Sequence, residues 1–372
     1  MGLAVSCTTW HGRPDGERVS PDELLGGGVP APADSRLVEP GEVLAVGAEM
    51  RAFLDAHVDR KATDALKLHQ LTTAITDRRG FGLVYDDRTR TATETFRARR
   101  GNCLSFSGMF VAMARDVGLD VSFQEVEIPP DWTLDSDTYV LNRHVNVFVD
   151  LGASGTRVVD FNIADFRSSY EMRRISDTRA LAHFYNNLGV ERMQSGDSAS
   201  ALACFREAIA GGDRGFSPAW TNLGTLFLRQ VQPARAEAAY LEAIRADGSD
   251  LVAMSSLARL YERSGDHERA ATCRKRVIHH RNRNPYYRYE LAERAYQAER
   301  FDEAIGHLKF AARKRPAEDR FCFLLGLSYL KSGKEKLARQ WLARAEQVAA
   351  DEALRSRYTT KIERLLGRVP PR

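Results

Sequence analysis

One stretch of the sequence, residues 100–119, reads RGNCLSFSGMFVAMARDVGL and has the spacing of a buried helix. Its large apolar residues recur at intervals of four, three and four positions: Phe106, Phe110, Met113 and Val117. Small residues lie between them, which favours a helix with most of its surface packed against other elements. Gly118 follows the last of these residues and predicts the end of the helix.

The beginning of this helix carries a cysteine, Cys103, in a position suited to chemistry. Gly101 allows a sharp turn, and Asn102 is among the residues that best cap the first turn of a helix. At the first helical position, the helix dipole and the unpaired N–H groups favour a thiolate and suit an oxyanion on a substrate carbonyl. The alternative is a small buried residue without reactivity, because free cysteines are commonly buried and inert.

Two strand-like runs downstream each supply one polar residue of the required type. In residues 144–149, alternation places three valines on one face and His144 with Asn146 on the other. In residues 157–162, Asp160 alternates with apolar neighbours, and a Gly-Ala-Ser-Gly connection between the runs favours a hairpin. Antiparallel pairing would place His144 and Asp160 side by side, as a general base and its orienting carboxylate require.

The chain order of Cys103, His144 and Asp160 resembles that of the transglutaminase-like branch of the papain-type thiol enzymes. A Gly-x-Cys at a helix start, followed by an aromatic and a small residue, is similar to the nucleophile motif of that family. The resemblance covers roughly residues 45–170 and implies an α+β fold of helices and a small antiparallel sheet. It also implies that Cys103 is the nucleophile, His144 the base and Asp160 the residue that orients the base.

Three shorter segments narrow the resemblance: residues 89–96, 101–105 and 142–146. They are similar to a bacterial group in which a transglutaminase-like domain is followed by tetratricopeptide repeats. Some relatives of such domains have lost the cysteine, so the fold alone does not establish catalysis. This chain keeps all three residues of the triad.

The segment between the two halves of the site, residues 129–141, begins with paired prolines, which remove donors from a strand ladder. We therefore predict that the strand over residues 121–126 ends there and that a loop leads to the next strand. Trp132 in this loop either lines the substrate cleft or packs on its own domain. Asn102 and Asn146, like Trp132, are predicted either to support the site or to line the place where the substrate binds.

The second half of the chain is a repeat array. A leucine followed by glycine or alanine recurs at intervals of 35, 34, 34 and 34 residues: Leu188, Leu223, Leu257, Leu291 and Leu325. This period is the signature of tetratricopeptide helix pairs, and five units exceed the three that a stable all-α solenoid needs. The predicted segments are a flexible N-terminal stretch, a transglutaminase-like domain, five tetratricopeptide repeats, and a capping helix with a tail: residues 1–44, 45–176, 177–352 and 353–372.

In the tetratricopeptide family, certain positions on the first helix of each unit line a concave groove. In this sequence those positions hold basic and aromatic residues: Arg259, Arg263, Tyr286, Tyr289, Tyr296, Arg320, Phe323 and Lys331. The resemblance implies a groove for a protein or an acidic peptide, and the alternative is a basic solvated face without a partner. Nucleic acid is not an expected partner, because neither a nucleic-acid-binding motif nor a uniformly basic domain occurs.

Composition limits the remaining possibilities. The 372 residues are 43% hydrophobic and 28% charged, enough for a sizeable core and about two domains. The net charge of +4 conceals an asymmetry, because residues 1–181 hold 21 Lys and Arg against 27 Asp and Glu, and the rest hold 33 against 23. The five cysteines form no C-x-x-C pair and no phosphate-binding glycine motif occurs, so we predict no cofactor and no metal site.

The N-terminus leaves two alternatives open. Residues 3–7 place a small residue before Cys7 and resemble the lipobox of bacterial lipoproteins, although only six residues precede this cysteine. Residues 11–40 are rich in glycine and proline and are predicted to be a flexible tether. If translation starts upstream, the chain is a cell-envelope lipoprotein tethered to a membrane through Cys7; otherwise it is cytoplasmic and the cysteine is incidental.

The leading functional hypothesis is thiol-dependent acyl transfer on amide or peptide substrates by Cys103, His144 and Asp160. Attack by water would give hydrolysis, and attack by an amine would give transamidation. The alternative, from another functional class, is a catalytically silent interaction scaffold whose repeats recruit a partner. A metal site made of the same three residues is less favoured, because no fourth ligand is evident.

Overall fold

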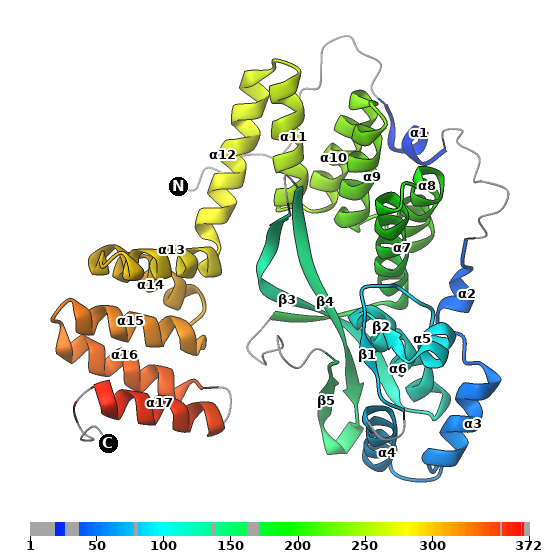
Figure 1. Ribbon diagram of the computed structural model, residues 1–372, viewed down its shortest axis with the longest axis horizontal. Helices are drawn as coiled ribbons and strands as arrows, with labels where there is room; N and C mark the ends of the chain where they lie inside the picture. The colour runs from blue at the N-terminus through cyan, green and yellow to red at the C-terminus, as the bar shows by residue number, and fades with distance from the viewer. Residues whose placement is uncertain are drawn as a thin grey trace. The chain divides into compact units, whose positions relative to one another are not determined.

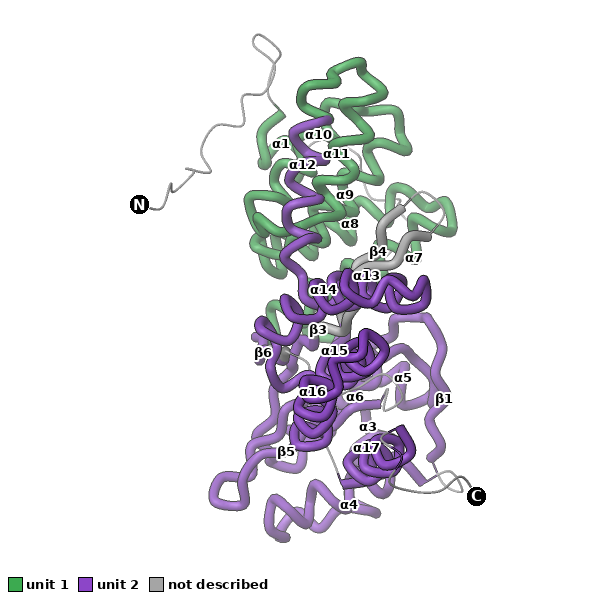
Figure 2. Tube along the Cα trace, turned by 90° about the vertical axis from the view of Figure 1, so that its left-hand side faces the viewer, with its two compact units in different colours: residues 1–42, 177–270 green, residues 43–176, 271–372 purple. Residues whose placement is uncertain are grey.

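The computed structural model describes residues 19–26, 37–77, 81–135, 138–161, 171–349, 352–365 and 367, with all their side chains except those of residues 127–143 and 171 (Figure 1). The chain divides into two compact units, one made of residues 1–42 and 177–270 and the other of residues 43–176 and 271–372 (Figure 2). Over its described residues the first unit is helical. The second combines helices and sheets in its first part with repeat helices in its second part.

Residues 43–176 form an α+β fold. The helices are α3 (Ala48–His57), α4 (Asp64–Thr76), α5 (Ala92–Ala98) and α6 (Cys103–Asp116). The strands are β1 (Val84–Tyr85), β2 (Arg100–Gly101), β3 (Asp120–Asp135), β4 (Thr138–Asp150), β5 (Thr156–Val159) and β6 (Glu171–Ile175), and the 3-10 turn η1 (Gly152–Ser154) joins β4 to β5. β1 and β2 pair in parallel, whereas the other four strands form an antiparallel sheet in the order β5-β4-β3-β6. The predicted hairpin and the predicted α+β class are confirmed.

Helix α6 is the central element of this fold, as its apolar spacing predicts. Its four regularly spaced apolar residues are each at most 4% exposed: Phe106, Phe110, Met113 and Val117. The helix contacts both β3 and β4, and the Phe106 ring lies 5.5 Å from that of Phe161, just after β5. Gly118 adopts the left-handed conformation, with φ +83°, that commonly ends a helix.

One prediction about the sheet is wrong. Residues 129–141 do not form a loop, because β3 and β4 continue through most of them as a long antiparallel hairpin. The register shifts between Glu127 and Trp132, and both prolines fall within this irregularity. A bulge accommodates residues that cannot donate to the ladder, so the prolines interrupt the pairing without ending the strand.

The repeat helices follow one another in pairs. They are α7 (Asp177–Gln194) with α8 (Ser198–Glu207), α9 (Ser217–Arg229) with α10 (Pro233–Ala246), α11 (Leu251–Arg263) with α12 (His267–Arg283), α13 (Pro285–Gln297) with α14 (Phe301–Lys314), and α15 (Asp319–Lys331) with α16 (Glu335–Gln347). A short π-helix, η2 (Ala208–Gly212), extends α8, and α17 (Glu352–Leu365) follows the last pair. The predicted helix pairs and the predicted solenoid class are confirmed.

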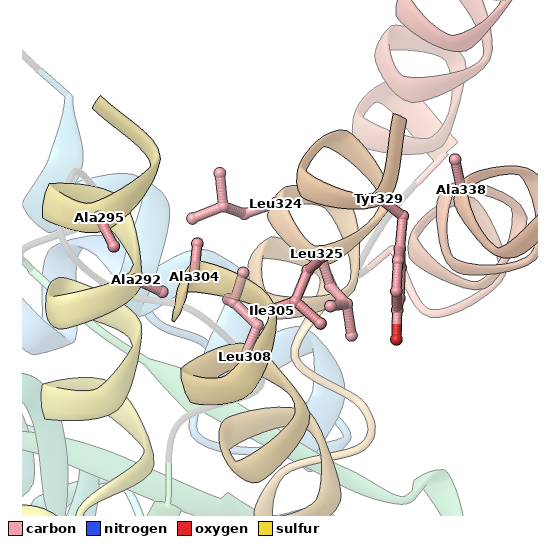
Figure 3. Close-up of a cluster of buried hydrophobic side chains, with 9 residues drawn as sticks. All are labelled: Ala292, Ala295, Ala304, Ile305, Leu308, Leu324, Leu325, Tyr329 and Ala338. Atoms are coloured by element: carbon pink, nitrogen blue, oxygen red, sulfur yellow. The ribbon is translucent and has the colours of Figure 1, made fainter. Parts of the chain in front are cut away.

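Small residues let the paired helices approach closely at the positions that the repeat period predicts. A Cβ atom at Gly224 in α9 would lie 2.7 Å from the Tyr240 ring in α10, so this position requires glycine. The later repeats share a core in which alanines lie beside larger apolar residues (Figure 3). Its buried members come from α13 to α16: Ala292, Ala295, Ala304, Ile305, Leu308, Leu324, Leu325, Tyr329 and Ala338.

Part of the predicted N-terminal tether is folded instead. Helix α1 (Pro21–Gly26) packs against α10, and its Leu24 is 0% exposed; α2 (Pro40–Val43) follows later in the chain. Ser20 and Glu23 form a capping box: the Ser20 amide donates to Glu23 Oε2 at 2.6 Å, and the Glu23 amide donates to Ser20 Oγ at 3.1 Å. This local helix signal is present in the sequence, but it lies among glycines and prolines that dominate the composition of the segment. Cys7 lies outside the described residues.

Candidate active site

Cys103 is the first residue of α6 and is half-buried. Asn102 caps the helix as predicted, because its Oδ1 accepts a hydrogen bond of 2.9 Å from the Ser105 amide. The first hydrogen bond along the helix backbone runs from the Phe106 amide to the Asn102 carbonyl at 3.0 Å. The amides of Cys103 and Leu104 precede this bond, so the helical ladder does not use them.

Gly101 is needed for a close approach to Ser105 and not for the sharp turn that the sequence suggests. It is not among the glycines with positive φ, so it does not supply a left-handed turn. A Cβ atom at this position would lie 2.7 Å from the Ser105 Cβ, a distance that side chains do not tolerate. The left-handed residue is Arg99, with φ 53°, which ends α5 just before β2.

His144 and Asp160 meet at the edge of the antiparallel sheet. The His144 Nε2 lies 2.9 Å and 2.8 Å from the two oxygens of the Asp160 carboxylate. The Asn146 Nδ2 donates to Asp160 Oδ2 at 2.9 Å and so holds the carboxylate from a second direction. Cys103 lies close enough to the ring for its side chain and charge to raise the pKa of His144, and Nε2 of that ring faces the carboxylate. The three predicted triad residues therefore come together.

The charge state of His144 follows from its neighbours. Burial lowers its pKa, but the hydrogen bonds and charges of Asp160 and Cys103 outweigh burial and raise the pKa to about 9. The imidazole is therefore protonated at neutral pH. A protonated imidazole near Cys103 puts a positive charge beside the sulfur.

A hydrogen bond between elements fixes the distance from the nucleophile to the base. Ser107 lies one turn after Cys103 in α6, and its hydroxyl donates to the Val145 carbonyl in β4 at 3.0 Å. Val145 is the neighbour of His144 along the strand. Because Ser107 is 1% exposed and the bond excludes water, the helix and the strand are held in one register.

Comparisons with known proteins agree with this architecture. The family model described as the transglutaminase-like superfamily matches residues 51–149, and the tetratricopeptide repeat model matches residues 186–250, 221–276, 255–305 and 289–353. The chain joins a transglutaminase-like domain to tetratricopeptide repeats.

One curated protein and several solved structures are similar to the chain. A TPR repeat-containing protein of Methanocaldococcus jannaschii, MJ1428, is 29% identical over 97 residues, which make up 26% of this chain and 17% of that protein. The crystal structure of MamA is 17% identical with a TM-score of 0.25, and covers 45% of this chain and 91% of its own. The structure described as YrrB, a TPR protein with an unusual peptide-binding site, is 16% identical with a TM-score of 0.25, and covers 48% of this chain and 92% of its own.

Two residues of the transglutaminase-like domain join the site without a signal in the sequence pattern. Gln124 on β3 lies directly opposite Asn146 on β4, and each has a buried acceptor oxygen with no hydrogen-bond partner among the described residues. Tyr85 on β1 pairs with Gly101 and is 59% exposed. Partial desolvation, followed by the charges of Cys103 and nearby aspartates, raises its pKa. Only strand register brings these residues to the site, which is why composition and spacing do not reveal them.

Trp132 lies in β3, paired with Leu141, and its side chain is outside the described part of the chain. Its predicted contact with substrate stays a prediction. Over the described residues, no group of three or more His, Cys, Asp or Glu side chains has the arrangement of a metal site. Over the same residues, no helix is both long enough and apolar enough to cross a bilayer.

The predicted partner groove divides between the two units. Arg259 and Arg263 belong to α11 in the first unit, and the second unit holds the others: Tyr286, Tyr289, Tyr296, Arg320, Phe323 and Lys331. The Phe323 ring lies 4.8 Å from the Tyr358 ring of α17, whereas Lys331 is exposed. The two arginines and the other six residues are therefore separate sets, each within its own unit.

Several of these groove residues take part in packing. The rings of Tyr286 and Tyr289 lie 5.2 Å and 5.1 Å from the ring of Phe321, which is fully buried. Arg320 forms an ion pair of 2.7 Å with Glu318, which is 2% exposed. The two tyrosines of α13 thus stabilise the contact with α15 of the next repeat, whereas the ion pair of Arg320 lies at the start of α15 itself.

Proposed function

We propose that the chain catalyses thiol-dependent acyl transfer on amide or peptide substrates. The observation that carries the proposal is the placement of His144, whose Nε2 lies within hydrogen-bond distance of both Asp160 oxygens and whose pKa is raised by the nearby Cys103. This is the arrangement that activates a thiol: the nucleophile lies next to the base, and the base is held by a carboxylate.

In the first step, the Cys103 sulfur attacks the carbonyl carbon of the substrate, and the carbonyl π electrons move to the oxygen. The amides of Cys103 and Leu104 at the start of α6 are placed to donate to this oxyanion. As the tetrahedral intermediate collapses, the C–N bond breaks and the protonated His144 gives its proton to the leaving amine. The product is a thioester on Cys103 and a neutral imidazole held by Asp160.

In the second step, water or a primary amine attacks the thioester, and His144 accepts a proton from the attacking group. The C–S bond breaks, the thiolate is restored beside the imidazolium, and the acid or the new amide leaves. The repeat array recruits a protein or peptide that presents the substrate. This part of the proposal rests on the match to the tetratricopeptide repeat family, whose stacked helix pairs create extended binding surfaces.

The test uses an activated acyl ester, p-nitrophenyl acetate, with intact-mass and peptide mass spectrometry. We expect rapid acetylation of Cys103 and faster loss of the acetyl group when a primary amine is added. Cys103→Ala should abolish acetylation, whereas Cys204→Ala, which removes a buried thiol in α8, should leave it unchanged. A wild-type chain that is not acetylated at Cys103, or a Cys103→Ala chain acetylated equally fast, would refute the proposed function.

A further inference from the structure

Helix α1 occupies a defined place on the repeat helices of its own unit. It packs against α10 (Figures 1 and 2). The Leu24 side chain of this helix is completely buried. The carbonyl of Leu24 accepts a hydrogen bond of 3.2 Å from Arg206 Nε in α8. A helix of six residues is too short to be stable alone in water, so this turn depends on the surface that receives it.

The receiving surface is basic, and the turn that it holds is acidic. Asp22 forms an ion pair of 3.3 Å with Arg214. Hydrogen bonds from Ser20 and, more weakly, the charge of Arg235 lower the pKa of Glu23, which places Glu23 within the field of Arg235. The positive charges of the surface and its apolar contact with Leu24 are therefore complementary to an acidic segment that carries a leucine.

Two of the cations on this surface also repel each other. Burial and the nearby charge of Arg235 lower the pKa of Arg206, so the two guanidinium groups lie close together in a partly desolvated place. Like charges in such a place favour an anionic neighbour. Residues 20–25 bring two acidic residues to this surface, where Asp22 pairs with Arg214 and the Leu24 carbonyl accepts the hydrogen bond of Arg206.

We propose that the face of α8 and α10 around Arg206 and Arg235 is a docking surface for an acidic helical turn that carries a leucine, supplied by a partner protein. Residues 20–25 are the resident ligand of this surface within the chain, and a partner segment of the same chemistry displaces them. The surface is built from α8 and α10, whereas the predicted groove residues lie on α11, α13 and α15. The inference is therefore independent of the proposed acyl transfer.

The test measures binding of a fluorescent, end-blocked peptide with the sequence of residues 19–26 to the full chain by fluorescence anisotropy. In the wild type, the resident turn competes, so binding should be weak. In Leu24→Asp the resident turn is released, and the peptide should bind at least about tenfold more tightly. Adding Arg206→Glu to this variant should weaken binding at least about tenfold, because the hydrogen bond to the leucine carbonyl and the positive charge are both lost.

The matched control is Arg245→Glu in the Leu24→Asp background. Arg245 lies ten residues after Arg235 on the same helix, about 15 Å along its axis, and should not affect peptide binding. A peptide in which both acidic residues are replaced by lysine should fail to bind. The proposal is overturned if Leu24→Asp binds the peptide no better than wild type, or if Arg206→Glu and Arg245→Glu have equal effects.

A second measurement avoids reliance on a substituted chain. Excess unlabelled peptide added to the wild-type chain should accelerate amide hydrogen exchange at residues 20–25, because it displaces them. Unchanged exchange at saturating peptide would contradict the proposal. A wild-type dimer that becomes a monomer in Leu24→Asp, detected by light scattering, would also overturn it, since the ligand would then be the same turn from a second copy.

Discussion

The cysteine at the start of α6 and the cysteines within the repeat helices have the same side chain in opposite surroundings. Cys103 is half-buried at a helix N-terminus beside a protonated imidazole. Cys204 and Cys322 are at most 1% exposed inside α8 and α15, where burial raises the pKa of Cys204 to about 12 and that of Cys322 to about 11. Position within the helix and the neighbouring charge, rather than the residue type, thus separate a candidate nucleophile from packing residues.

Removal of the charge on Asp160 should give the largest effect among the supporting residues. Asp160→Asn leaves a side chain of the same shape that cannot stabilise the imidazolium or fix its tautomer. We expect hydrolysis of the acetyl-Cys103 thioester to slow by about 10²- to 10⁴-fold, measured by mass spectrometry after rapid acetylation. Asp120→Asn at the start of β3, an exposed position, is the control and should hydrolyse the thioester at the wild-type rate.

Removal of the imidazole should change the pH dependence of the thiol. In His144→Gln, alkylation of Cys103 at about pH 6 should slow by about 10- to 100-fold, because the positive charge beside the sulfur is lost. At about pH 9.5 the two chains should react at similar rates. Equal rates at about pH 6 would show that His144 does not activate Cys103.

The same substitution should also affect stability in a pH-dependent way. The pKa of His144 in the folded chain, about 9, exceeds the ordinary value of 6.5. Protonated His144 therefore stabilises the folded state fully below pH 6.5, and this contribution is lost as the pH rises through about 9. The difference in melting temperature between wild type and His144→Gln should shrink over that interval.

Loss of a buried serine hydroxyl should have a smaller effect, and its effect on catalysis should differ between the candidate active site and the repeat helices. Ser107→Ala removes the hydrogen bond between α6 and β4 and should cost about 1 kcal/mol of unfolding free energy. It should also slow acetylation of Cys103 by about tenfold, since the helix and the strand lose their fixed register. Ser328→Ala in α15 removes a buried hydroxyl that donates to its own helix, at the Leu324 carbonyl. It should change stability by a similar amount and leave acetylation unchanged.

Local signals in the sequence predict much of the fold and the core of the candidate site. Asn102 caps α6, Thr91 and Glu94 form a capping box at the start of α5, and the 34-residue period gives the helix pairs. Each of these signals acts within a few residues or repeats along the chain. Alternation in β4 places His144 and Asn146 together for the same reason.

Features that depend on pairing between distant segments escape this kind of prediction. The strand that passes Pro129 and Pro130 is supported by its partner strand, and Gln124 reaches the site only through the register of β3 with β4. Leu24 lies in a helix that packs against α10, more than 200 residues further along the chain, so its own neighbours in the sequence do not reveal its burial. In each case the deciding contact is nonlocal.

The central claim is that Cys103 is an activated thiol in a chain whose repeat cysteines are inert. The direct measurement is the rate of alkylation of each cysteine by iodoacetamide at about pH 6, followed in the folded wild-type chain by peptide mass spectrometry. We predict that Cys103 reacts at least about 10²-fold faster than Cys204 and Cys322, and that denaturation removes the difference. Equal, slow alkylation of all three cysteines in the folded chain would contradict the account.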